Sequence, residues 1–420
     1  VHIWRKALTI SMNRVRSVLM ASPIDISSDQ LGPISNESEF AKILAAHYRT
    51  YLIVGISPIY SRYRSSFVTR FSGRASGNLR VVTLPILYRK YLALLSKLVF
   101  AFLSSFILLI LCIRTEVKAI IARDNSVPTV MSFFAKLLRV PLIYRPVSTP
   151  FRLDEIGVFN FPWYVSRLFR IIMRIFDVVS LRRATRIFVS SPTGKDMILS
   201  QLPIPDDKIV FVPYPIPDIF FSRERPTVQG LDHTAGGIVL GYFGTLNEYY
   251  DFGPLLAGLG ALKQEGYKVR LDMYGDGPMR NHVLELASKA GLQEEINLRD
   301  IVPRNEVPRK YRSITATVIP YSEKLKKGVS LKSIEAMALQ VPVVISKRSD
   351  PLYVNEDNCI VLEHGSADEW QVAIRETMNH ELRERLVSGG ARTARRFQWS
   401  AVAGLVWQTI DSLDQRERQA

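Results

Sequence analysis

The chain has 420 residues, 47% of them hydrophobic and 22% charged, which suits a globular protein of two or three domains and excludes a disordered one. Its formal net charge is +16, and the excess lies in residues 1–230, which carry 31 Lys and Arg against 14 Asp and Glu. Two cysteines, Cys112 and Cys359, exclude a disulfide framework and favour a reducing cytoplasm. No nucleic-acid-binding motif accompanies the basic half, so we expect its partner to be an anionic membrane surface or an acidic substrate.

The first half of the chain alternates between apolar strands and helices, as in a parallel α/β sheet. Strands are expected at residues 18–21, 51–56, 79–84, 119–122, 141–144 and 186–190. An amphipathic helix is expected over residues 37–47. The N-terminal residues lack an apolar core adequate for a secretory signal, so we expect a cytoplasmic protein.

The most apolar run, residues 98–113, reads LVFAFLSSFILLILCI and has basic flanks. It falls short of the roughly 20 residues that a spanning helix needs. We interpret it as a core or membrane-dipping helix, with a transmembrane span as the alternative. Residues 167–186 form an arginine-rich helical stretch that suits a membrane interface, although an exposed charged face on a buried helix explains it equally well. We therefore expect a peripheral protein on the inner face of the cell membrane.

A proline-rich run over residues 203–217 leads into a polar, glycine-containing segment at residues 223–237. We place a domain boundary there. The alternation then restarts, with strands expected at residues 237–244, 269–274, 296–298, 315–320 and 341–345. The predicted domains are residues 1–230 and residues 231–420, each Rossmann-like, and the last helix is a candidate to pack back on the first domain.

Residues 318–346 read VIPYSEKLKKGVSLKSIEAMALQVPVVIS and carry the most specific pattern in the chain. Ser330 is placed to cap a short helix, so the backbone amides of Leu331 and Lys332 point out of its start toward any anion there. Glu335 lies about one turn further on, where its carboxylate can accept hydrogen bonds from ribose hydroxyls. A diphosphate end and a diol end one turn apart describe a nucleotide.

Two loops supply further contacts for the same anion. The loop before the helix is basic, and its last residues include Lys327 and Gly328. The strand at residues 237–244 ends in a glycine turn, Gly244-Thr245, whose backbone amides can approach a phosphate closely.

The sequence Glu335-Ala336-Met337-Ala338, followed by Pro342-Val343-Val344, resembles the donor site of the retaining glycosyltransferases of family 4 (group 1). The resemblance implies the GT-B fold, in which two Rossmann-like α/β domains face each other across a cleft. The family signature has two glutamates separated by seven residues, and the second, which generally holds the ribose, corresponds to Glu335. The first corresponds to Lys327, and the usual helix-ending glycine to Gln340.

Two more segments are similar to parts of that family. Gly275 and Gly277 lie in a Tyr-Gly-Asp-Gly-Pro stretch that resembles its G-x-G-P turn. Val302 belongs to a stretch like the one that lines the base pocket. The resemblance therefore implies donor-binding roles for all three residues.

Transfer from a nucleotide sugar develops negative charge on the departing diphosphate. The chain has no Asp-x-Asp motif and no histidine pair at metal-binding spacing, so we expect neither metal nor cofactor. Preorganised amides and cations must then stabilise that charge, and Lys327 and Lys332 are the predicted catalytic cations. Arg145 is the third predicted catalytic residue. Like Arg123, it follows a strand of the first domain and is predicted to contact acceptor or phosphate.

The sequence thus predicts a hexosyltransferase that moves a sugar from a nucleotide-diphosphate sugar to a lipid-linked or cell-envelope polysaccharide acceptor. A nucleotide-sugar epimerase of the same fold is one alternative, and it would act on the donor alone. A non-catalytic partner protein is another. It is favoured by Lys327 in place of a glutamate, by the lack of a cation after Gly244 and by the lack of a suitably placed histidine in residues 1–230.

Overall fold

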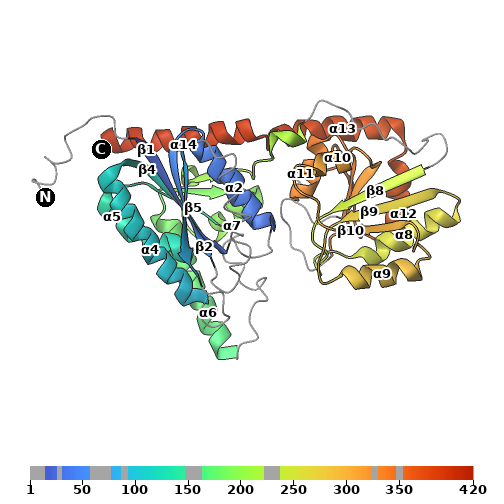
Figure 1. Cartoon of the computed structure of the whole chain (residues 1–420), viewed down its shortest axis with the longest axis horizontal. Coiled ribbons are helices and arrows are strands. Elements are labelled where there is room, and N and C mark those ends of the chain that lie inside the picture. Colours follow the sequence, from blue (N-terminus) through green and yellow to red (C-terminus); the bar gives the residue numbers. More distant parts are fainter. Residues whose placement is uncertain are drawn as a thin grey trace, which may run out of the picture. The chain divides into compact units, whose positions relative to one another are not determined.

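The chain folds into two compact α/β units, each with a parallel sheet and flanking helices (Figure 1). A computed structural model describes residues 15–25, 31–56, 77–86, 93–146, 163–221, 237–322, 330–346 and 353–419. The first unit comprises residues 1–213 and 402–420, and the second comprises residues 214–401. The division falls inside the proline-rich run at residues 203–217, earlier than the predicted boundary at residue 230, and the segment at residues 222–236 lies outside the described residues.

The first unit contains a seven-stranded parallel sheet of order β3-β2-β1-β4-β5-β6-β7. Its strands are β1 (Arg16–Asp25), β2 (Arg49–Ile56), β3 (Leu79–Pro85), β4 (Glu116–Arg123), β5 (Leu142–Arg145), β6 (Arg186–Val189) and β7 (Ile209–Phe211). Its helices are α2 (Leu31–Ala45), α4 (Ala93–Arg114), α5 (Ser126–Leu138), α6 (Trp163–Arg183), α7 (Pro192–Gln201) and most of α14 (Trp399–Gln419).

The apolar run at residues 98–113 forms all but the first five residues and the last residue of α4, which packs on the sheet together with α5. Phe100 and Leu108 of α4 are fully buried with Met131 of α5 and with Leu19 and Ala21 of β1, in one continuous core. Successive residues of a strand point to opposite faces, so Leu19 and Ala21 face these helices while the intervening residues face the other side. One side of α4 is therefore core, as the sequence predicts.

Helix α14 packs against the first unit through polar and aromatic contacts. The indole nitrogen of Trp407 donates to the carbonyl of Ile43 at 2.8 Å, and the hydroxyl of Tyr48 donates to Asp411 at 2.8 Å. The Trp407 ring stacks on His47 with ring centres 5.0 Å apart. The last helix thus belongs to the unit that contains the start of the chain.

The second unit contains a six-stranded parallel sheet of order β10-β9-β8-β11-β12-β13. Its strands are β8 (Gly237–Phe243), β9 (Lys268–Tyr274), β10 (Ile296–Arg299), β11 (Ala316–Ile319), β12 (Val343–Ser346) and β13 (Ile360–Leu362). Its helices are α8 (Phe252–Gln264), α9 (Arg280–Lys289), α10 (Val307–Tyr311), α11 (Leu331–Ala338), α12 (Ala367–Glu376) and α13 (His380–Arg395).

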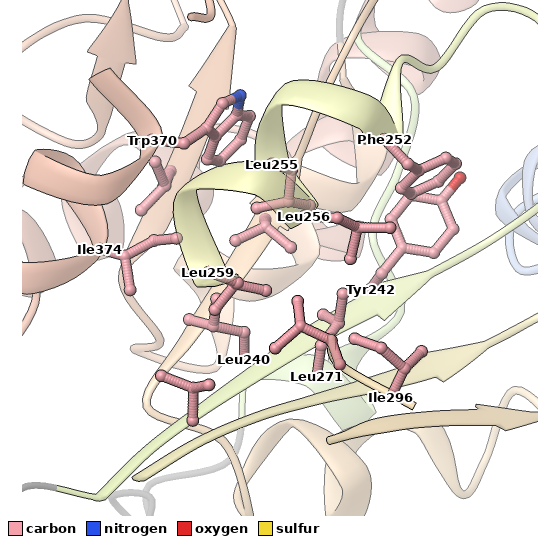
Figure 2. Packing of buried hydrophobic residues seen from close by; sticks show 14 of the residues in the cluster. Leu240, Tyr242, Phe252, Leu255, Leu256, Leu259, Leu271, Ile296, Trp370 and Ile374 are labelled. Atoms are coloured by element: carbon pink, nitrogen blue, oxygen red, sulfur yellow. The ribbon is translucent and has the colours of Figure 1, made fainter. Parts of the chain in front are cut away.

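Helix α8 supplies much of the core of the second unit, because its leucines lie between the sheet and α12 (Figure 2). Leu255 and Leu259 of α8 are buried beside Leu240 of β8 and Trp370 of α12. At the end of this core the ring of Tyr242 packs edge-on against Phe252, with ring centres 5.0 Å apart. The core therefore fixes Tyr242 at the carboxyl end of β8.

Helix α11 ends in a Schellman motif whose left-handed position is occupied by glutamine. Gln340 has φ 60°, its amide donates to the carbonyl of Met337, and the amide of Val341 donates to the carbonyl of Ala336. A side chain in this conformation brings Cβ close to the following carbonyl, which costs roughly 1–2 kcal/mol.

Gln340→Gly is accordingly expected to raise the free energy of unfolding by about 0.5–1 kcal/mol, because the relieved strain exceeds the added flexibility of the unfolded chain. Denaturant unfolding of the two proteins measures the difference. Gln340→Ala keeps Cβ and is the matched control, for which no gain is expected. Equal stabilisation by alanine would contradict the backbone explanation.

Candidate functional site

The candidate donor site lies where the carboxyl ends of β8, β9 and β11 meet the start of α11. The strand order reverses between β8 and β11, because β9 and β10 follow on one side and β12 and β13 on the other. Ligands of parallel α/β sheets bind in the crevice at such a reversal. The sequence-predicted residues Gly244, Gly275 and Ser330 all lie at this edge.

The loops after β8 and β9 pack directly against each other. The amide of Gly244 donates to the carbonyl of Tyr274 at 2.9 Å, and the amide of Gly275 donates to Arg299 at 3.1 Å. A Cβ at position 275 would clash with the carbonyl of Gly244, and one at position 277 would clash with that of Leu246. Gly275 and Gly277 are therefore required for close packing of the two loops.

Ser330 caps α11 as predicted. Its backbone is extended, with φ −82° and ψ 101°, and its hydroxyl accepts a hydrogen bond from the amide of Ser333 at 3.3 Å. In an α-helix the first amides have no acceptor within the helix, so those of Leu331 and Lys332 point out of the helix start. This end of α11 presents the partial positive charge that suits an anion.

The side chain of Lys332 runs from α11 to the glycine turn after β8. Its ammonium group donates to the hydroxyl of Tyr250 at 2.8 Å and to that of Tyr242 at 3.1 Å. A Cβ at position 244, which has φ 140°, would clash with Lys332. The contribution of Gly244 to the site is thus space for this lysine, since its own amide is bonded to Tyr274.

Burial lowers the pKa of Lys332 from 10.5 to about 7, although nearby Glu335 acts in the opposite direction. Burial raises the pKa values of Tyr242, Tyr250 and Tyr321, so these phenols remain neutral. The ammonium lies 4.0 Å from the ring centre of Tyr250 and 4.4 Å from that of Tyr242. Lys332 is therefore a cation held by neutral aromatic groups and able to change its protonation state near neutral pH.

Glu335 lies one turn after Lys332 and is almost fully buried, with 8% of its surface exposed. Its carboxylate accepts from the guanidinium of Arg304 at 2.7 Å. Arg304 follows β10 in the same loop as Val302, the residue predicted to line the base pocket. The structure thus brings Glu335 beside the Val302 loop and gives it a cationic partner that the sequence does not predict.

Two predicted residues, Lys327 and Gly328, lie outside the described residues, as do Lys324 and Lys326 of the same loop. Their roles remain predictions. One cation does lie beside the glycine turn, the ammonium group of Lys332, although no basic residue follows Gly244 in the sequence. Thr245 is exposed at the turn, and its carbonyl accepts from Tyr242 at 2.7 Å.

Arg145, the third predicted catalytic residue, lies in the first unit at the end of β5. It is buried, donates to Glu37 and lies with its guanidinium 4.2 Å from the ring centre of Phe40. Arg123 at the end of β4 pairs with the same carboxylate. The structure thus assigns both arginines a buried ion pair with Glu37, and the contact of Arg145 with acceptor or phosphate remains a prediction.

In the described ranges no group of three or more histidine, cysteine, aspartate or glutamate side chains is arranged to hold a metal ion. The predicted independence from metal remains a prediction.

The sequence does not single out Tyr242, Tyr250 and Arg304 as site residues. Tyr242 lies in an apolar strand and reads as core, and Tyr250 lies in the stretch that lacks a cation. One feature of the sequence could have indicated the two tyrosines. A buried lysine on a short helix beside a glycine turn needs hydrogen-bond acceptors, and tyrosine hydroxyls near that turn can provide them.

Residues 237–380 match the family model of the group 1 glycosyl transferases. The match covers about a third of the chain and lies within the second unit. This match confirms the prediction of a glycosyltransferase at the level of the domain, and all of the predicted donor-binding residues lie within it. No curated protein matches the chain.

Solved structures resemble the whole chain. HepE (Alr3699) of Anabaena, in complex with UDP, has a TM-score of 0.69 at 14% identity, over 94% of this chain and 100% of its own. Sucrose-phosphate synthase of Thermosynechococcus elongatus has a TM-score of 0.68 at 14% identity, over 96% and 100%. The lipopolysaccharide outer core galactosyltransferase WaaB has a TM-score of 0.62 at 12% identity, over 94% and 99%. At such identities the likeness shows the fold, and the predicted GT-B class is confirmed.

Proposed function

We propose that the protein is a retaining, metal-independent glycosyltransferase of family 4 that takes its sugar from a nucleotide-diphosphate sugar. The observation that carries this proposal is the spacing along α11. Lys332 and the outward-pointing amides of the helix start lie at one end, and the carboxylate of Glu335 lies one turn away. A diphosphate at the first and a ribose diol at the second place the nucleotide across the helix start.

The departing diphosphate gains negative charge as its bond to the sugar breaks. The ammonium of Lys332 and the amides of α11 are fixed before the reaction, so they stabilise that charge without reorganisation. A donor of the nucleotide-diphosphate sugar class is supported by the likeness to HepE, which has been solved in complexes with UDP and with UDP-glucose.

We further propose a lipid-linked or cell-envelope acceptor, with the protein on the inner face of the cell membrane. The excess of 17 positive charges in residues 1–230 (31 basic against 14 acidic residues) supports an anionic surface as the location. The structural likeness to WaaB, a lipopolysaccharide galactosyltransferase, supports an envelope acceptor.

A thermal-shift screen of UDP, GDP and ADP sugars tests the donor class. A nucleotide present at 100 times its Kd adds about 2.7 kcal/mol of apparent stability, so the true donor class is expected to give a clear rise in Tm. The corresponding nucleoside monophosphates are the controls, because they lack the diphosphate that Lys332 is proposed to bind. No response to any nucleotide sugar would overturn the proposal.

Two alternatives differ from the proposal in the fate of the bound donor. A non-catalytic partner protein is favoured by one observation, the ion pair that already occupies Glu335. That alternative predicts donor binding without turnover on any lipid-linked acceptor. A nucleotide-sugar epimerase predicts turnover of the donor with no acceptor present. Product analysis with and without acceptor separates the three.

A further inference from the structure

The exposed apolar surface of the protein is concentrated on three consecutive helices of the first unit. Of 18 large hydrophobic side chains exposed in the described ranges, 12 lie on α4, α5 and α6. On α4 they recur every three or four residues and form one stripe: Leu95, Val99, Phe102, Phe106, Ile110 and Ile113. A contiguous apolar stripe on the outside of a folded domain, next to polar residues, is typical of an interaction site.

The two neighbouring helices extend this surface. Helix α5 contacts both α4 and α6, and the three lie along the same side of the first unit (Figure 1). Phe133 and Leu137, one turn apart on α5, are 58% and 76% exposed. The guanidinium of Arg183 on α6 lies 4.1 Å from the ring centre of Phe133, so the apolar surface passes directly into a cationic one.

The charge of this surface is one-sided. Helices α4, α5 and α6 carry eight Lys and Arg residues and a single carboxylate, Asp177, which is buried. On α6 the exposed Arg167, Arg170 and Arg174 follow one stripe and the exposed Leu168, Ile171 and Ile175 follow the adjacent one. Parallel stripes of arginine and apolar residues are typical of a helix that lies in the interface of an anionic bilayer.

Helix α4 is long and apolar enough to cross a membrane, and Leu94–Arg114 is the one such segment among the described residues. Its inner side is nevertheless part of the core, where Phe100, Ala101 and Ser104 are fully buried. A spanning orientation would pull these residues out of the first unit. A spanning orientation of α4 is therefore incompatible with the folded first unit.

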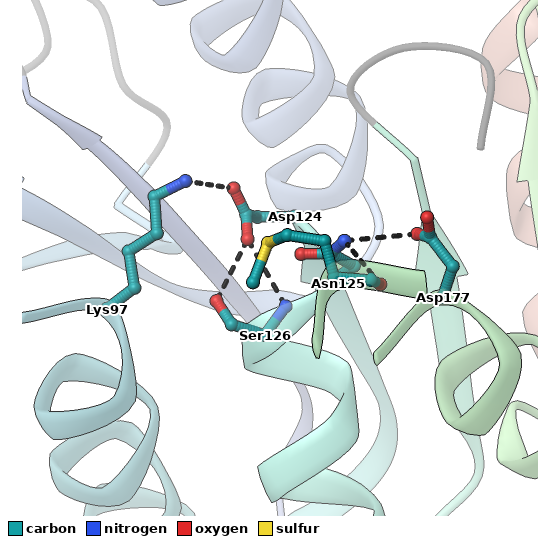
Figure 3. Close-up of polar contacts among 6 residues, drawn as sticks. Lys97, Asp124, Asn125, Ser126 and Asp177 are labelled. Atoms are coloured by element: carbon teal, nitrogen blue, oxygen red, sulfur yellow. Dashed lines mark hydrogen bonds and ion pairs between the residues drawn. The ribbon is translucent and has the colours of Figure 1, made fainter. Parts of the chain in front are cut away.

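A polar network fixes the relative positions of the three helices (Figure 3). Lys97 of α4 pairs with Asp124 at 2.6 Å, and Asp124 accepts from the amide and hydroxyl of Ser126 at the start of α5. Burial would raise the pKa of Asp124, but Lys97 and these bonds outweigh it and hold the pKa below its usual value. Asn125 in turn donates to Asp177 of α6 at 3.1 Å. The apolar surface is thus already formed in the unbound protein.

We propose that α4, α5 and α6 form a preformed docking surface that enters the headgroup layer of an anionic bilayer, with the helix axes parallel to the membrane. This identifies the surface behind the proposed location of the protein and does not depend on donor chemistry. Phenylalanine and isoleucine of α4 enter the boundary of the acyl chains, and the arginines of α6 contact lipid phosphates. Bilayer attachment therefore has one component that salt weakens and one that it does not.

Flotation of the full chain with vesicles tests the proposal. Binding to phosphatidylglycerol-containing vesicles is expected, with partial release at high salt. The double variant Phe102→Asp/Phe106→Asp is expected to lose at least ten-fold in bound fraction. The matched control, Leu284→Asp/Val372→Asp, changes two exposed apolar residues of the second unit and is expected to bind like the unmodified protein. Circular dichroism and the nucleotide thermal shift of each variant distinguish loss of docking from loss of fold or of donor binding.

A second variant tests the cationic part. Arg167→Glu/Arg170→Glu/Arg174→Glu is expected to remove the preference for anionic over neutral vesicles, whereas Lys268→Glu/Lys289→Glu in the second unit is expected to keep it. Equal flotation of the unmodified protein and the phenylalanine variant would overturn the proposal. So would resistance to alkaline carbonate, which would indicate a spanning helix, or a dimer that the phenylalanine variant dissociates, which would assign the surface to a second copy.

Discussion

Lys332→Met is expected to lower the rate of sugar transfer about 10²–10³-fold, because it removes the preorganised cation that faces the departing diphosphate. Methionine fills nearly the same volume beside Gly244, so the loop packing is retained. Initial rates at saturating donor measure the effect. Lys289→Met, at an exposed position of α9, is the matched control and should leave the rate unchanged.

The lowered pKa of Lys332 allows a second test of its role at the diphosphate, through the pH dependence of donor affinity. The pKa of its ammonium is about 7 in the ligand-free protein, and a bound diphosphate raises it because opposite charges favour the protonated form. Donor affinity is then expected to be constant below pH 7 and to fall by up to about ten-fold per pH unit above it. A nucleotide sugar suits this measurement, since its diphosphate diester does not titrate near neutrality. Lys332→Arg should abolish the slope, because arginine stays charged.

In the absence of donor, the free energy of unfolding is expected to rise with pH over the range in which donor affinity falls. Between pH 7 and about 10.5 the unfolded chain holds the Lys332 proton and the folded chain does not, so the free energy of unfolding contributed by this group rises with pH. Among the described residues, the titratable groups that contact Lys332 or act on its charge are Tyr242, Tyr250, Tyr311 and Glu335. The three phenols have raised pKa values and do not titrate in the lower part of this window. Comparison with Lys332→Met isolates the contribution of the lysine.

Glu335→Ala is expected to weaken donor binding by about 1.5–3 kcal/mol, which corresponds to about 10–150-fold in Kd, through loss of a charge-assisted hydrogen bond to ribose. Titration calorimetry with the responding nucleotide sugar measures it. A 2′,3′-dideoxy nucleotide is the matched ligand control. It lacks the diol, so its affinity should be similar for the variant and the unmodified protein. Unchanged affinity for the natural donor in the variant would remove Glu335 from the donor site.

The partner of Glu335 allows a sharper version of this experiment. Arg304 holds the carboxylate at 2.7 Å, so Arg304→Gln should weaken donor binding only while Glu335 is present. In the Glu335→Ala background the same change should have no further effect. Additive losses would show that Arg304 binds the nucleotide by itself instead of orienting the glutamate.

Local patterns predict most elements of the fold and the start of α11. Alternating apolar runs locate the central strands, and the Ser330 cap depends only on the next three residues of the chain. Element ends are less accurate, because they depend on tertiary contacts. The helix predicted over residues 37–47 spans Leu31–Ala45, and the one predicted over residues 167–186 ends at Arg183, since Arg186 already pairs with Ile143 in the sheet.

The composition of the candidate site could be predicted only where its members are neighbours in sequence. Lys332 and Glu335 share one helix, so their spacing follows from helical geometry. Tyr242 and Tyr250 are 90 and 82 residues away from Lys332, and only the folded sheet brings them together. Arg304 and Glu335 are 31 residues apart, and the loop after β10 brings them into contact. Patterns of apolar and polar residues along the chain do not predict such a contact.

The return of α14 to the first unit determines the order in which a nascent chain can mature. Residues 214–401 are contiguous, whereas the first unit lacks α14 until residues 402–420 have been synthesised. Val406 and Ile410 of α14 are fully buried in the finished protein, so the apolar surface that they cover stays open while the whole second unit is made. Domains generally mature from the N-terminus onward during synthesis, at about 5–20 residues per second. In this chain the second unit is complete in sequence before the first unit has its last helix, so the N-terminal unit is the later of the two to be able to close its core.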